Sequence, residues 1–537
     1  TVVDRLLASS HFGQRMASEW LDVARYSDSY GYQVDRDRRV WPWRDWVIRV
    51  FNDNKPFDEF LTEQLAGDLL PAANDDQVLA TTFNRLHPQK VEGGSEPEEF
   101  RIEYVADRVQ TAVTAFMGLT LECCRCHHHK FDPVSQKEYY QLSAFFDNID
   151  EAGLYSFFTD SVPTPTLKLP TEAQTARLQE MARAVAQADH DLEQIRNPWS
   201  GRAMTDWSKD QVSRESLSPP AGQIAHLDFE SEITPPNQSL EGPQGRAVQL
   251  TGDDAIELEV GNFPRWQPFS VSLWFKPTIH HKRAVVFHRS RAWTDAGSRG
   301  YQLLLEDGRL SFSLVHFMPG NAITVRTASR LPEQQWTHVT VTYDGSSRAG
   351  GIRLFLNGSP SELEVVRDKL TKNLTGGGND HISIGARFRD NGFRQGLVDE
   401  FRVFDRGLTE IEADRLFNAS IPGKTWQPDA MQEFFLKTHC QPYREQLSEL
   451  KARRQSLFRL QDQIQEIMVM RELPKPRSTY LLRRGAYDAR EREVQPGVPA
   501  CLPPWPAEEP RNRLGLARWL TDPRHPLLAR VTVNRFW

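Results

Sequence analysis

The sequence predicts a multidomain α + β protein in which an all-β jelly-roll sandwich is inserted between mostly helical segments. Three observations predict this fold. Helical periodicity dominates both ends of the chain, alternating strand-like runs fill residues 221–420, and two long amphipathic segments flank those runs. With 537 residues, the chain is long enough to bury several separate cores.

Residues 1–165 are expected to form a mostly helical first domain. Pro42 suits the first turn of one helix, and residues 98–116 show the periodicity of a longer one. Ser135 and Glu138 have the spacing of a capping box at the start of a later helix. A cysteine-rich stretch between the last two helices is therefore predicted to lie in a connecting turn.

Two further segments, residues 171–196 and 441–470, carry apolar residues at alternating steps of three and four. These apolar positions are Leu178, Met181, Val185, Ala188, Leu192 and Ile195 in the first, and Tyr443, Leu447, Leu450, Leu457, Ile464 and Ile467 in the second. Because the segments are similar in length and enclose the strand-like region, they predict an antiparallel helical hairpin. The alternative is two independent surface helices.

Residues 221–420 are predicted to form the inserted sandwich. Alternating runs such as residues 270–275 and 338–343 have the period of half-buried strands, and Asp344-Gly345 and Asn357-Gly358 are hairpin-turn signals. We expect this region to fold without its flanks, because its own core is expected to need nothing from them.

Residues 474–537 are expected to begin a further domain. The chain starts at Thr1 inside a helical pattern, without an initiator methionine, and stops at Trp537 without a terminating signal. We therefore expect a fragment of a longer protein, so that targeting cannot be read from it.

The composition narrows the function classes. A net charge of −7 and a pI near 6.1 argue against broad nucleic-acid binding. No apolar run approaches the ~18 residues that a membrane span requires. Cys440 and Cys501 stand alone in the sequence, and the cysteines do not suggest a disulfide framework.

Residues 123–130 read Cys-Cys-Arg-Cys-His-His-His-Lys, which includes three of the chain's 5 cysteines. Cys123, Cys126 and His127 match C-x-x-C-H, the pattern that attaches c-type haem. One helical turn puts both sulfurs on one face, where they reach the two vinyl groups of a porphyrin. His127 then follows as the proximal iron ligand. The spacing therefore predicts haem c, with Cys123 and Cys126 as thioether anchors.

Other interpretations of these residues stay open. Cys123 and Cys126 suit zinc in combination with one or two of His127, His128 and His129, although no second C-x-x-C or H-x-x-H lies nearby. The vicinal pair Cys123 and Cys124 suits redox chemistry. A purely structural cluster is the remaining alternative.

Several other polar residues are candidates by residue type. Met117 and His87 are candidates for a distal haem ligand on that ground alone. Arg25 and Asp107 belong to charged sites within otherwise apolar helices, where buried ion pairs are common. The functional alternative is a polar pocket beside the cysteine cluster, with Asp107 or Asp28 as acid or base.

The inserted region resembles the laminin-G-like, concanavalin-A-like jelly roll. The resemblance lies in residues 336–345, 352–358 and 393–409. It implies an extracytoplasmic sandwich that binds glycan or protein, frequently with one calcium ion. Asp228 and Asp399 match positions where that family often places calcium carboxylates, and calcium favours oxygen ligands. The alternative is a calcium-free scaffold in which Asp399 only caps a strand.

The flanks resemble an uncharacterised cytochrome-associated domain that is abundant in planctomycete bacteria, together with its partner domain. Residues 20–29 and 123–133 carry the first resemblance, and residues 512–523 carry the second. In such proteins a separate haem-binding domain often comes first, and a laminin-G-like domain is sometimes inserted. The resemblance implies truncation at both ends and a periplasmic or cell-surface location, but no mechanism, because the family's function is unknown.

These observations lead to two expectations for function. The first is an extracytoplasmic redox protein that holds haem c, exchanges electrons with a partner, and docks a glycan or protein on the jelly roll. The second is a surface-adhesion or polysaccharide-handling protein whose Cys/His cluster is structural or binds zinc. The sequence names no substrate, reaction or oligomeric state, and it leaves open whether the protein is an enzyme.

Overall fold

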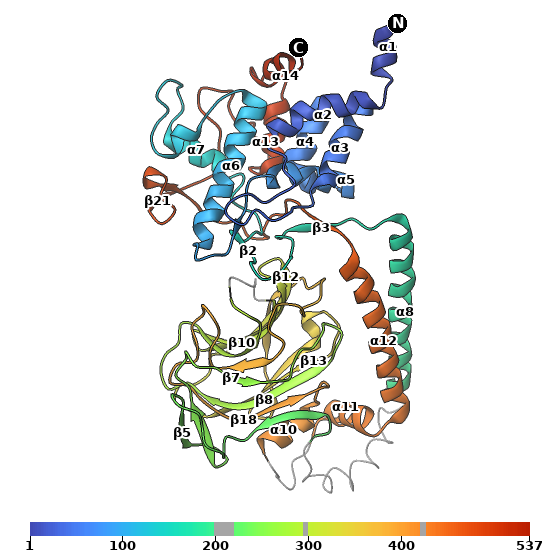
Figure 1. The fold of residues 1–537 in the computed structure, drawn as a ribbon, viewed down its shortest axis with the longest axis vertical. Helices are drawn as coiled ribbons and strands as arrows, with labels where there is room; N and C mark the ends of the chain where they lie inside the picture. Colours follow the sequence, from blue (N-terminus) through green and yellow to red (C-terminus); the bar gives the residue numbers. More distant parts are fainter. Residues whose placement is uncertain (198–219, 294–298, 419–425) are drawn as a thin grey trace. The chain divides into compact units, whose positions relative to one another are not determined.

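The computed structural model describes residues 1–197, 220–293, 299–418 and 426–537 (Figure 1). The chain divides into two compact units. Residues 1–169 and 465–537 together form a helical unit, and residues 170–464 form a unit that contains the β-sandwich. The predicted fold class is confirmed, because helical segments precede and follow a sandwich of antiparallel sheets along the chain. Among the described residues, no helix is both long and apolar enough to cross a membrane.

The helical unit is built from both ends of the chain. Its α-helices are α1 (Val2–Leu7), α2 (His11–Val23), α3 (Trp41–Asn52), α4 (Phe57–Ala66), α5 (Asp75–Ala80), α6 (Pro97–Met117), α7 (Gln136–Ser143), α13 (Arg513–Thr521) and α14 (Leu528–Phe536). Pro42 lies in the first turn of α3, as the sequence predicts. Ser135 and Glu138 form the predicted capping box of α7.

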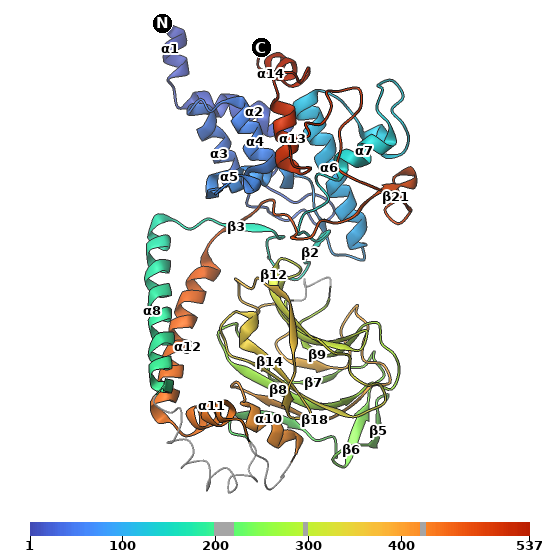
Figure 2. The same cartoon turned by 180° about the vertical axis from the view of Figure 1, so that it is seen from behind.

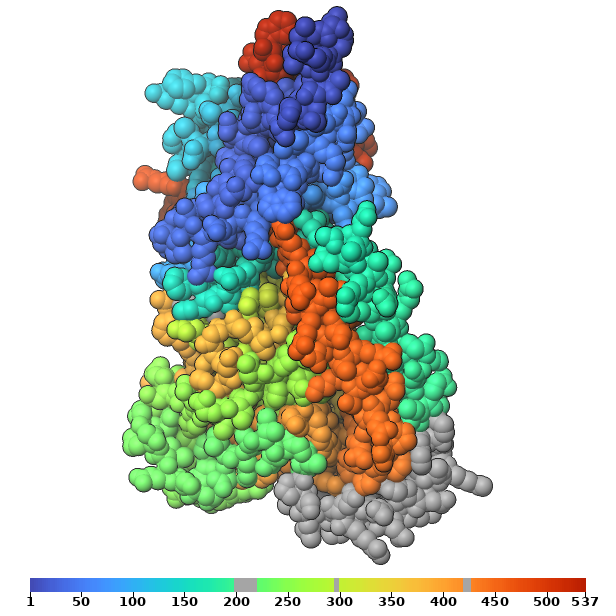
Figure 3. All heavy atoms as spheres, turned by 45° about the vertical axis from the view of Figure 1, so that its right-hand side comes forward, coloured from blue at the N-terminus to red at the C-terminus, as the bar shows by residue number. Residues whose placement is uncertain are grey.

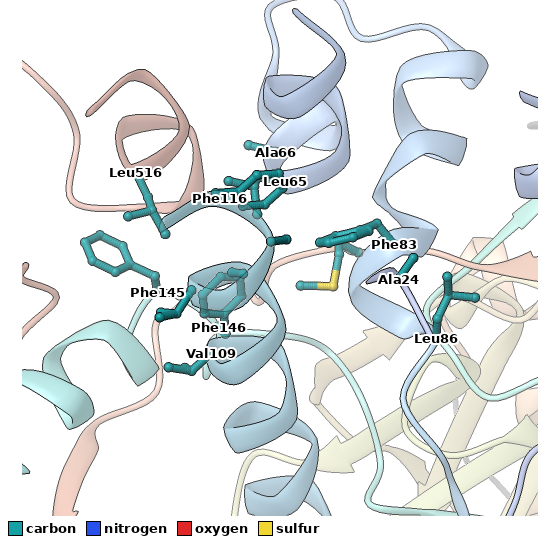
Figure 4. Packing of buried hydrophobic residues seen from close by; sticks show 14 of the residues in the cluster. Ala24, Leu65, Ala66, Phe83, Leu86, Val109, Phe116, Phe145, Phe146 and Leu516 are labelled. Carbon is teal, nitrogen blue, oxygen red and sulfur yellow. The ribbon is translucent and has the colours of Figure 1, made fainter. Parts of the chain in front are cut away.

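The core of the helical unit is one cluster of apolar side chains, part of which Figure 4 shows. Trp20 is fully buried and donates its indole N–H to Gln64 at 2.8 Å. Leu516, from α13, packs in the same cluster as Phe116 and Phe145 (Figure 4). Each such side chain contributes roughly 1.5–3 kcal/mol when it is fully buried. The C-terminal segment is therefore part of this core.

A buried group of charges fixes the middle of the same unit. Glu151 accepts two hydrogen bonds from Arg108, both 2.6 Å long, and one from Arg85 at 2.7 Å. These three side chains are at most 1% exposed. Ion pairs of this kind tolerate burial only when every partner is present, because each charge loses its hydration.

The insertion begins and ends at a two-stranded ladder. β3 (Thr166–Lys168) pairs in antiparallel fashion with β19 (Glu466–Met468), and the amide of Leu169 donates to the carbonyl of Gln465 at 2.9 Å. This ladder corrects the helix expected over residues 441–470. The helix ends at Gln463, because Ile467 pairs with β3 and is fully buried in the core of the helical unit.

The predicted helical hairpin is confirmed. α8 (Glu172–Arg196) and α12 (Gln441–Gln463) run side by side, as Figures 2 and 3 show. Arg453 donates to the carbonyl of Ala184 at 2.9 Å, and Gln446 donates to that of Ala188 at 3.3 Å. Residue numbers that rise on one helix and fall on the other identify the antiparallel arrangement.

The sandwich consists of two antiparallel sheets. The seven-stranded sheet has the order β16 (Leu363–Asp368), β12 (Asn321–Thr327), β11 (Arg309–Phe317), β10 (Gly300–Glu306), β9 (Ala284–Arg289), β17 (Ile382–Ile384) and β7 (Ile256–Leu258). The eight-stranded sheet has the order β15 (Ser359–Pro360), β14 (Ile352–Leu356), β13 (Thr337–Tyr343), β8 (Phe269–Lys276), β18 (Leu397–Phe404), β6 (Arg246–Gln249) and β5 (Gln238–Glu241), and β4 (Gln223–Leu227) pairs with β18.

Two shorter helices complete this unit. They are α10 (Glu410–Phe417) and α11 (Pro428–Thr438). The ring of Phe417 lies 5.3 Å from that of Trp274 on the eight-stranded sheet. The sheet therefore has a covered outer surface at this point, in addition to its inner face.

The sandwich is also joined to the hairpin. Arg265 donates to the carbonyl of Phe458 at 3.1 Å, pairs with Asp462 at 3.2 Å, and lies over the Phe458 ring at 4.1 Å. Lys372 donates to the carbonyl of Ile464 at 2.8 Å. The buried cation Arg265 therefore has acceptors on α12, and the independent folding of residues 221–420 stays a prediction.

The contacts with α12 predict different stabilities for two fragments. Residues 170–464 should unfold in one cooperative transition, whereas residues 220–418 should melt about 5–10 °C lower, because Arg265 loses its acceptors on α12 and the apolar surface next to it becomes exposed. Thermal unfolding followed by circular dichroism measures both values. Equal melting temperatures would show that the sandwich is independent of the hairpin.

The buried charges predict a large effect of Glu151→Gln. Arg85 and Arg108 would remain buried with a neutral partner, so we expect the free energy of unfolding of the helical unit to fall by about 3–5 kcal/mol. Denaturant unfolding of the whole chain, followed by tryptophan fluorescence, measures this loss. Asp160→Asn is the matched control, because the Asp160 side chain is fully exposed 4.0 Å from Arg36. A control effect as large as that of Glu151→Gln would contradict the assignment.

Candidate functional site

The cysteine cluster lies on one tight turn of the helical unit. A 3₁₀ turn, Glu122–Arg125, follows α6, and the amide of Cys126 donates to the carbonyl of Cys123 at 3.2 Å. Residues three apart in such a turn lie on the same side. Cys123 and Cys126 are exposed, whereas Cys124 is fully buried in the core. The structure therefore presents the two cysteines of the C-x-x-C pair together and separates Cys124 from them.

The three histidines of the cluster contact the backbone of their own loop. The Nδ1 atom of His128 accepts a hydrogen bond from the amide of Gln136 at 3.0 Å, and that of His129 accepts one from the amide of Asp132 at 2.7 Å. His127 Nδ1 lies 2.6 Å from the carbonyl of His128. His128 and His129 therefore cap backbone amides of the loop through their Nδ1 atoms.

The surroundings of the turn lack the apolar character of a haem pocket, because Cys123, Cys126, His127 and His128 are exposed. A porphyrin needs an apolar pocket of several hundred Å³, roughly 300 Å³ or more. The cavity that borders the turn at Arg125 measures about 30 Å³, which is room for about one water molecule. The histidines and Lys130 beside the thiols are polar and mostly exposed.

The residues considered for a distal haem ligand lie in the protein core. His87 is fully buried, its Nε2 atom lies 3.0 Å from Arg108, and its Nδ1 atom lies 3.0 Å from the carbonyl of Pro88. Burial and the charge of Arg108 lower the pKa of His87 well below its ordinary value. Met117 is also buried in that core. Both side chains therefore pack inside the helical unit.

The residues of the cysteine cluster do not form a complete set of metal ligands. Across the described ranges, no group of three or more histidine, cysteine, aspartate or glutamate side chains is placed to hold a metal ion. The Sγ atom of Cys126 donates to the carbonyl of Arg484 at 3.3 Å. This contact binds the thiol to the backbone of a segment that lies far away in the sequence.

The acid–base alternative falls on residues that form local pairs. Asp107 forms an ion pair with Arg25 at 2.6 Å, and burial raises the pKa of Asp107 against the effect of that charge. Asp28 accepts a hydrogen bond from the hydroxyl of Tyr26 at 2.7 Å. These contacts fit the structural interpretation of both carboxylates.

The structure also places Cys501 near the cluster, although it stands alone in the sequence. The amide of Ala500 donates to Glu138 at 2.7 Å, and Glu138 caps the helix that follows the cysteine loop. Cys501 is exposed, and burial of its thiol together with the charge of Glu138 raises its pKa. No local sequence pattern predicts this contact, because more than three hundred residues separate Ala500 from Glu138 in the chain.

A second candidate site is an open groove of about 1050 Å³ on the sandwich, here called the Arg283 groove. Its walls come from the loop before β9, the turn between β10 and β11, and residues 390–394. Lys282, Arg330 and Arg394 are exposed cations of this lining. The groove therefore combines volume with many hydrogen-bond donors.

The wall of the groove is fixed by a network around Arg283. The guanidinium donates twice to Asp390, both at 3.0 Å, and once to Glu306 at 2.9 Å. Burial raises the pKa of Asp390, but the hydrogen bonds from Arg283 and the charge of Arg387 hold it below its ordinary value. Asp390 therefore stays ionised at neutral pH and keeps Arg283 in place.

Exposed aromatic rings lie beside this network. Arg283 lies 4.8 Å from the centre of the Trp293 ring, and 41% of the Trp293 surface is exposed. Phe388, which is 58% exposed, follows Arg387 in the chain and lies in a short bridge opposite Ala292. Sequence reasoning missed these aromatic residues, because a single tryptophan in a strand-rich region carries no pattern of its own.

The two aspartates considered for calcium have different surroundings. Asp228 is exposed and lines a separate open groove of about 620 Å³, of which Asp399 is not part. Asp399 is fully buried and accepts hydrogen bonds from the amides of Glu400, at 2.8 Å, and Gln244, at 3.3 Å. Burial raises the pKa of Asp399 to about 7. Asp399 thus caps the backbone, as in the calcium-free alternative.

Comparison with protein-family models gives three matches along the chain. Residues 1–151 match a protein of unknown function (DUF1549), and residues 250–413 match the concanavalin A-like lectin/glucanases superfamily. Residues 512–537 match a second protein of unknown function (DUF1553). This order is the one that the resemblances predict, which confirms that expectation. No curated protein matches the chain.

Solved structures similar to this chain include one domain of an arabinanase and two domains described as binding domains. Domain 4 of AbnA, an extracellular arabinanase of Geobacillus stearothermophilus in complex with arabinotriose, is 18% identical, with a TM-score of 0.26, and the match covers 36% of this chain and 98% of that one. The binding domain of Paraclostridial Mosquitocidal Protein 1 is 17% identical, with a TM-score of 0.29 and coverages of 35% and 47%. The botulinum neurotoxin serotype G binding domain is 12% identical, with a TM-score of 0.27 and coverages of 35% and 45%. The chain thus spans less than half the length of the two toxin domains.

The buried Asp399 predicts a pH-dependent stability of residues 170–464. Because the folded-state pKa is raised above the unfolded value of 3.8 to about 7, the folded protein binds the proton more tightly between these values. Stability should therefore fall as pH rises through this window. Melting temperatures measured across it should show the decline in the wild type and a flatter profile in Asp399→Asn, at a lower overall stability, since one amide loses its acceptor.

Asp228→Asn is the matched control for this pH profile. Its side chain is exposed, so we expect the wild-type decline to remain. A decline that is equally steep in Asp399→Asn would contradict the assignment to Asp399.

Proposed function

We propose that the β-sandwich is a glycan-binding module and that the Arg283 groove holds its ligand. The observation that carries this proposal is the position of Trp293, an exposed ring that lies against Arg283, which lines a wide polar groove. Sugar rings combine apolar C–H faces with hydroxyl groups, and they suit sites where an aromatic surface lies beside several polar groups.

The charge network supports the proposal because it fixes polar atoms before a ligand arrives. Arg283 is held by Asp390 and Glu306, and the same guanidinium lies against Trp293. A preorganised wall of this kind reduces the entropy lost on binding. Carboxylate oxygens would accept from sugar hydroxyls, and the exposed cations Lys282 and Arg394 would donate to ring or hydroxyl oxygens.

This proposal favours the polysaccharide-handling alternative over a haem protein. It leaves the helical unit, which is built from two distant segments of the chain, as a separate part with its own chemistry. We include a periplasmic or cell-surface location in the proposal, which the resemblance of the flanks implies.

Removal of the exposed ring should weaken binding. In the whole chain, Trp293→Ala should lower the affinity for an oligosaccharide selected from a glycan array by about tenfold or more, since stacking contributes about 0.5–1.5 kcal/mol beyond the area that it buries. Trp293→Phe should keep part of the affinity. Isothermal titration calorimetry measures these values.

The matched control is Trp41→Ala, which removes a ring of similar exposure, 43%, from the helical unit. Its affinity should equal that of the wild type. Binding that is insensitive to Trp293→Ala would place the ligand elsewhere, and an array without any bound glycan would refute the function itself.

A further inference from the structure

We propose that Cys123 and Cys126 form a thiol–disulfide exchange site that reacts with accessible disulfides. The site belongs to the helical unit and does not depend on glycan binding by the sandwich. It rests on the placement of two exposed thiols on one closed turn, with a third thiol buried between them in the sequence.

The turn brings the two residues within bonding range. The hydrogen bond from the Cys126 amide to the Cys123 carbonyl, 3.2 Å long, closes the turn. Turns of this type hold their first and fourth Cα atoms less than about 7 Å apart. A disulfide needs a Cα separation of about 4.4–6.8 Å. Because residues three apart in a 3₁₀ turn share one side, the pair requires little backbone movement to close.

Burial selects the partner of Cys123. Cys124 has no exposed surface, and its thiol lies 3.7 Å from the carbonyl of Val134 inside the core. A disulfide between the neighbours Cys123 and Cys124 would have to extract that side chain from its packing. The vicinal redox pair suggested by the sequence is therefore replaced by the pair Cys123 and Cys126.

The contacts of the two thiols give them different roles. The Cys126 thiol donates to the carbonyl of Arg484, a residue held in the left-handed region at φ 52°. A Cβ atom added at Gly485 would lie 3.4 Å from the Cys126 sulfur, so this turn packs closely on it. Cys123 is exposed and has no side-chain hydrogen bond within the described part of the chain. Cys123 is therefore the attacking thiol, and Cys126 is the resolving thiol.

The reaction consists of two exchange steps. Cys123 loses its proton to solvent, and its thiolate attacks one sulfur of the substrate disulfide. This forms a mixed disulfide and releases the other substrate sulfur, which takes up a proton as a thiol. Cys126 then loses its proton and attacks the Cys123 sulfur, which releases the second substrate thiol. The protein is oxidised to a Cys123–Cys126 disulfide, and the substrate disulfide is reduced to two thiols.

Oxidised glutathione is a suitable probe of this chemistry. The reduced whole chain should lose two hydrogen atoms in mass, and peptide mass spectrometry should locate the new disulfide between Cys123 and Cys126. In Cys126→Ser, one glutathione should stay attached to Cys123, because the resolving thiol is absent. In Cys123→Ser, the internal disulfide should be lost.

Cys501→Ser is the matched control, because Cys501 is an exposed cysteine that belongs to no C-x-x-C pair. This variant should form the internal disulfide as the wild type does, and circular dichroism should show that all variants are folded. Failure of the folded wild type to form the internal disulfide would overturn the proposal. So would a haem that remains attached to the Cys123–Cys126 peptide in denaturant after expression with a haem-maturation system.

Discussion

The pairing of β3 with β19 decides where one unit of this protein ends and the other begins. Three residues on each side form the ladder, and they hold the two ends of a long insertion together. The chain therefore leaves and re-enters the helical unit at one point, and α8 and α12 must run antiparallel between the ladder and the sandwich. The same pairing lets residues from the C-terminal segment complete a core that the first residues of the chain begin.

Buried arginines determine how each unit holds its segments together. Arg513, at the start of α13, is fully buried and pairs with Asp68 at 2.7 Å, which joins the last segment of the chain to the first. Arg265 does the same between the sandwich and α12. A buried guanidinium is stable only with its acceptors in place, so these contacts enforce one arrangement of distant segments more strictly than apolar packing does. The half-buried Arg283 has a similar arrangement at the groove, where it donates to Asp390 and Glu306.

Periodicity predicted the helices, the hairpin and the sandwich, because local patterns of apolar residues determine which surfaces are buried. It placed the end of the second hairpin helix too late, since Ile467 continues the helical spacing but pairs with a strand that lies about three hundred residues earlier. The C-x-x-C-H motif was found by spacing alone, yet spacing could not tell that Cys124 is buried or that Arg484 contacts Cys126. The neighbours of Trp293 and Cys501, such as Arg283 and Glu138, lie far from them in the sequence or in no recognisable local pattern, so only the tertiary fold identifies them. Contacts between residues that are far apart in the chain are therefore the part of the candidate sites that local sequence patterns do not predict.

Glycan binding at the Arg283 groove is tested most directly by nuclear magnetic resonance of residues 170–464. Tryptophan indole N–H resonances report on individual rings, so they show which ring a ligand approaches. On titration with a bound oligosaccharide, the Trp293 indole resonance should shift, whereas that of Trp266, which packs against α12 and is 9% exposed, should not. Saturable shifts that leave Trp293 unchanged and map to another surface would contradict the account.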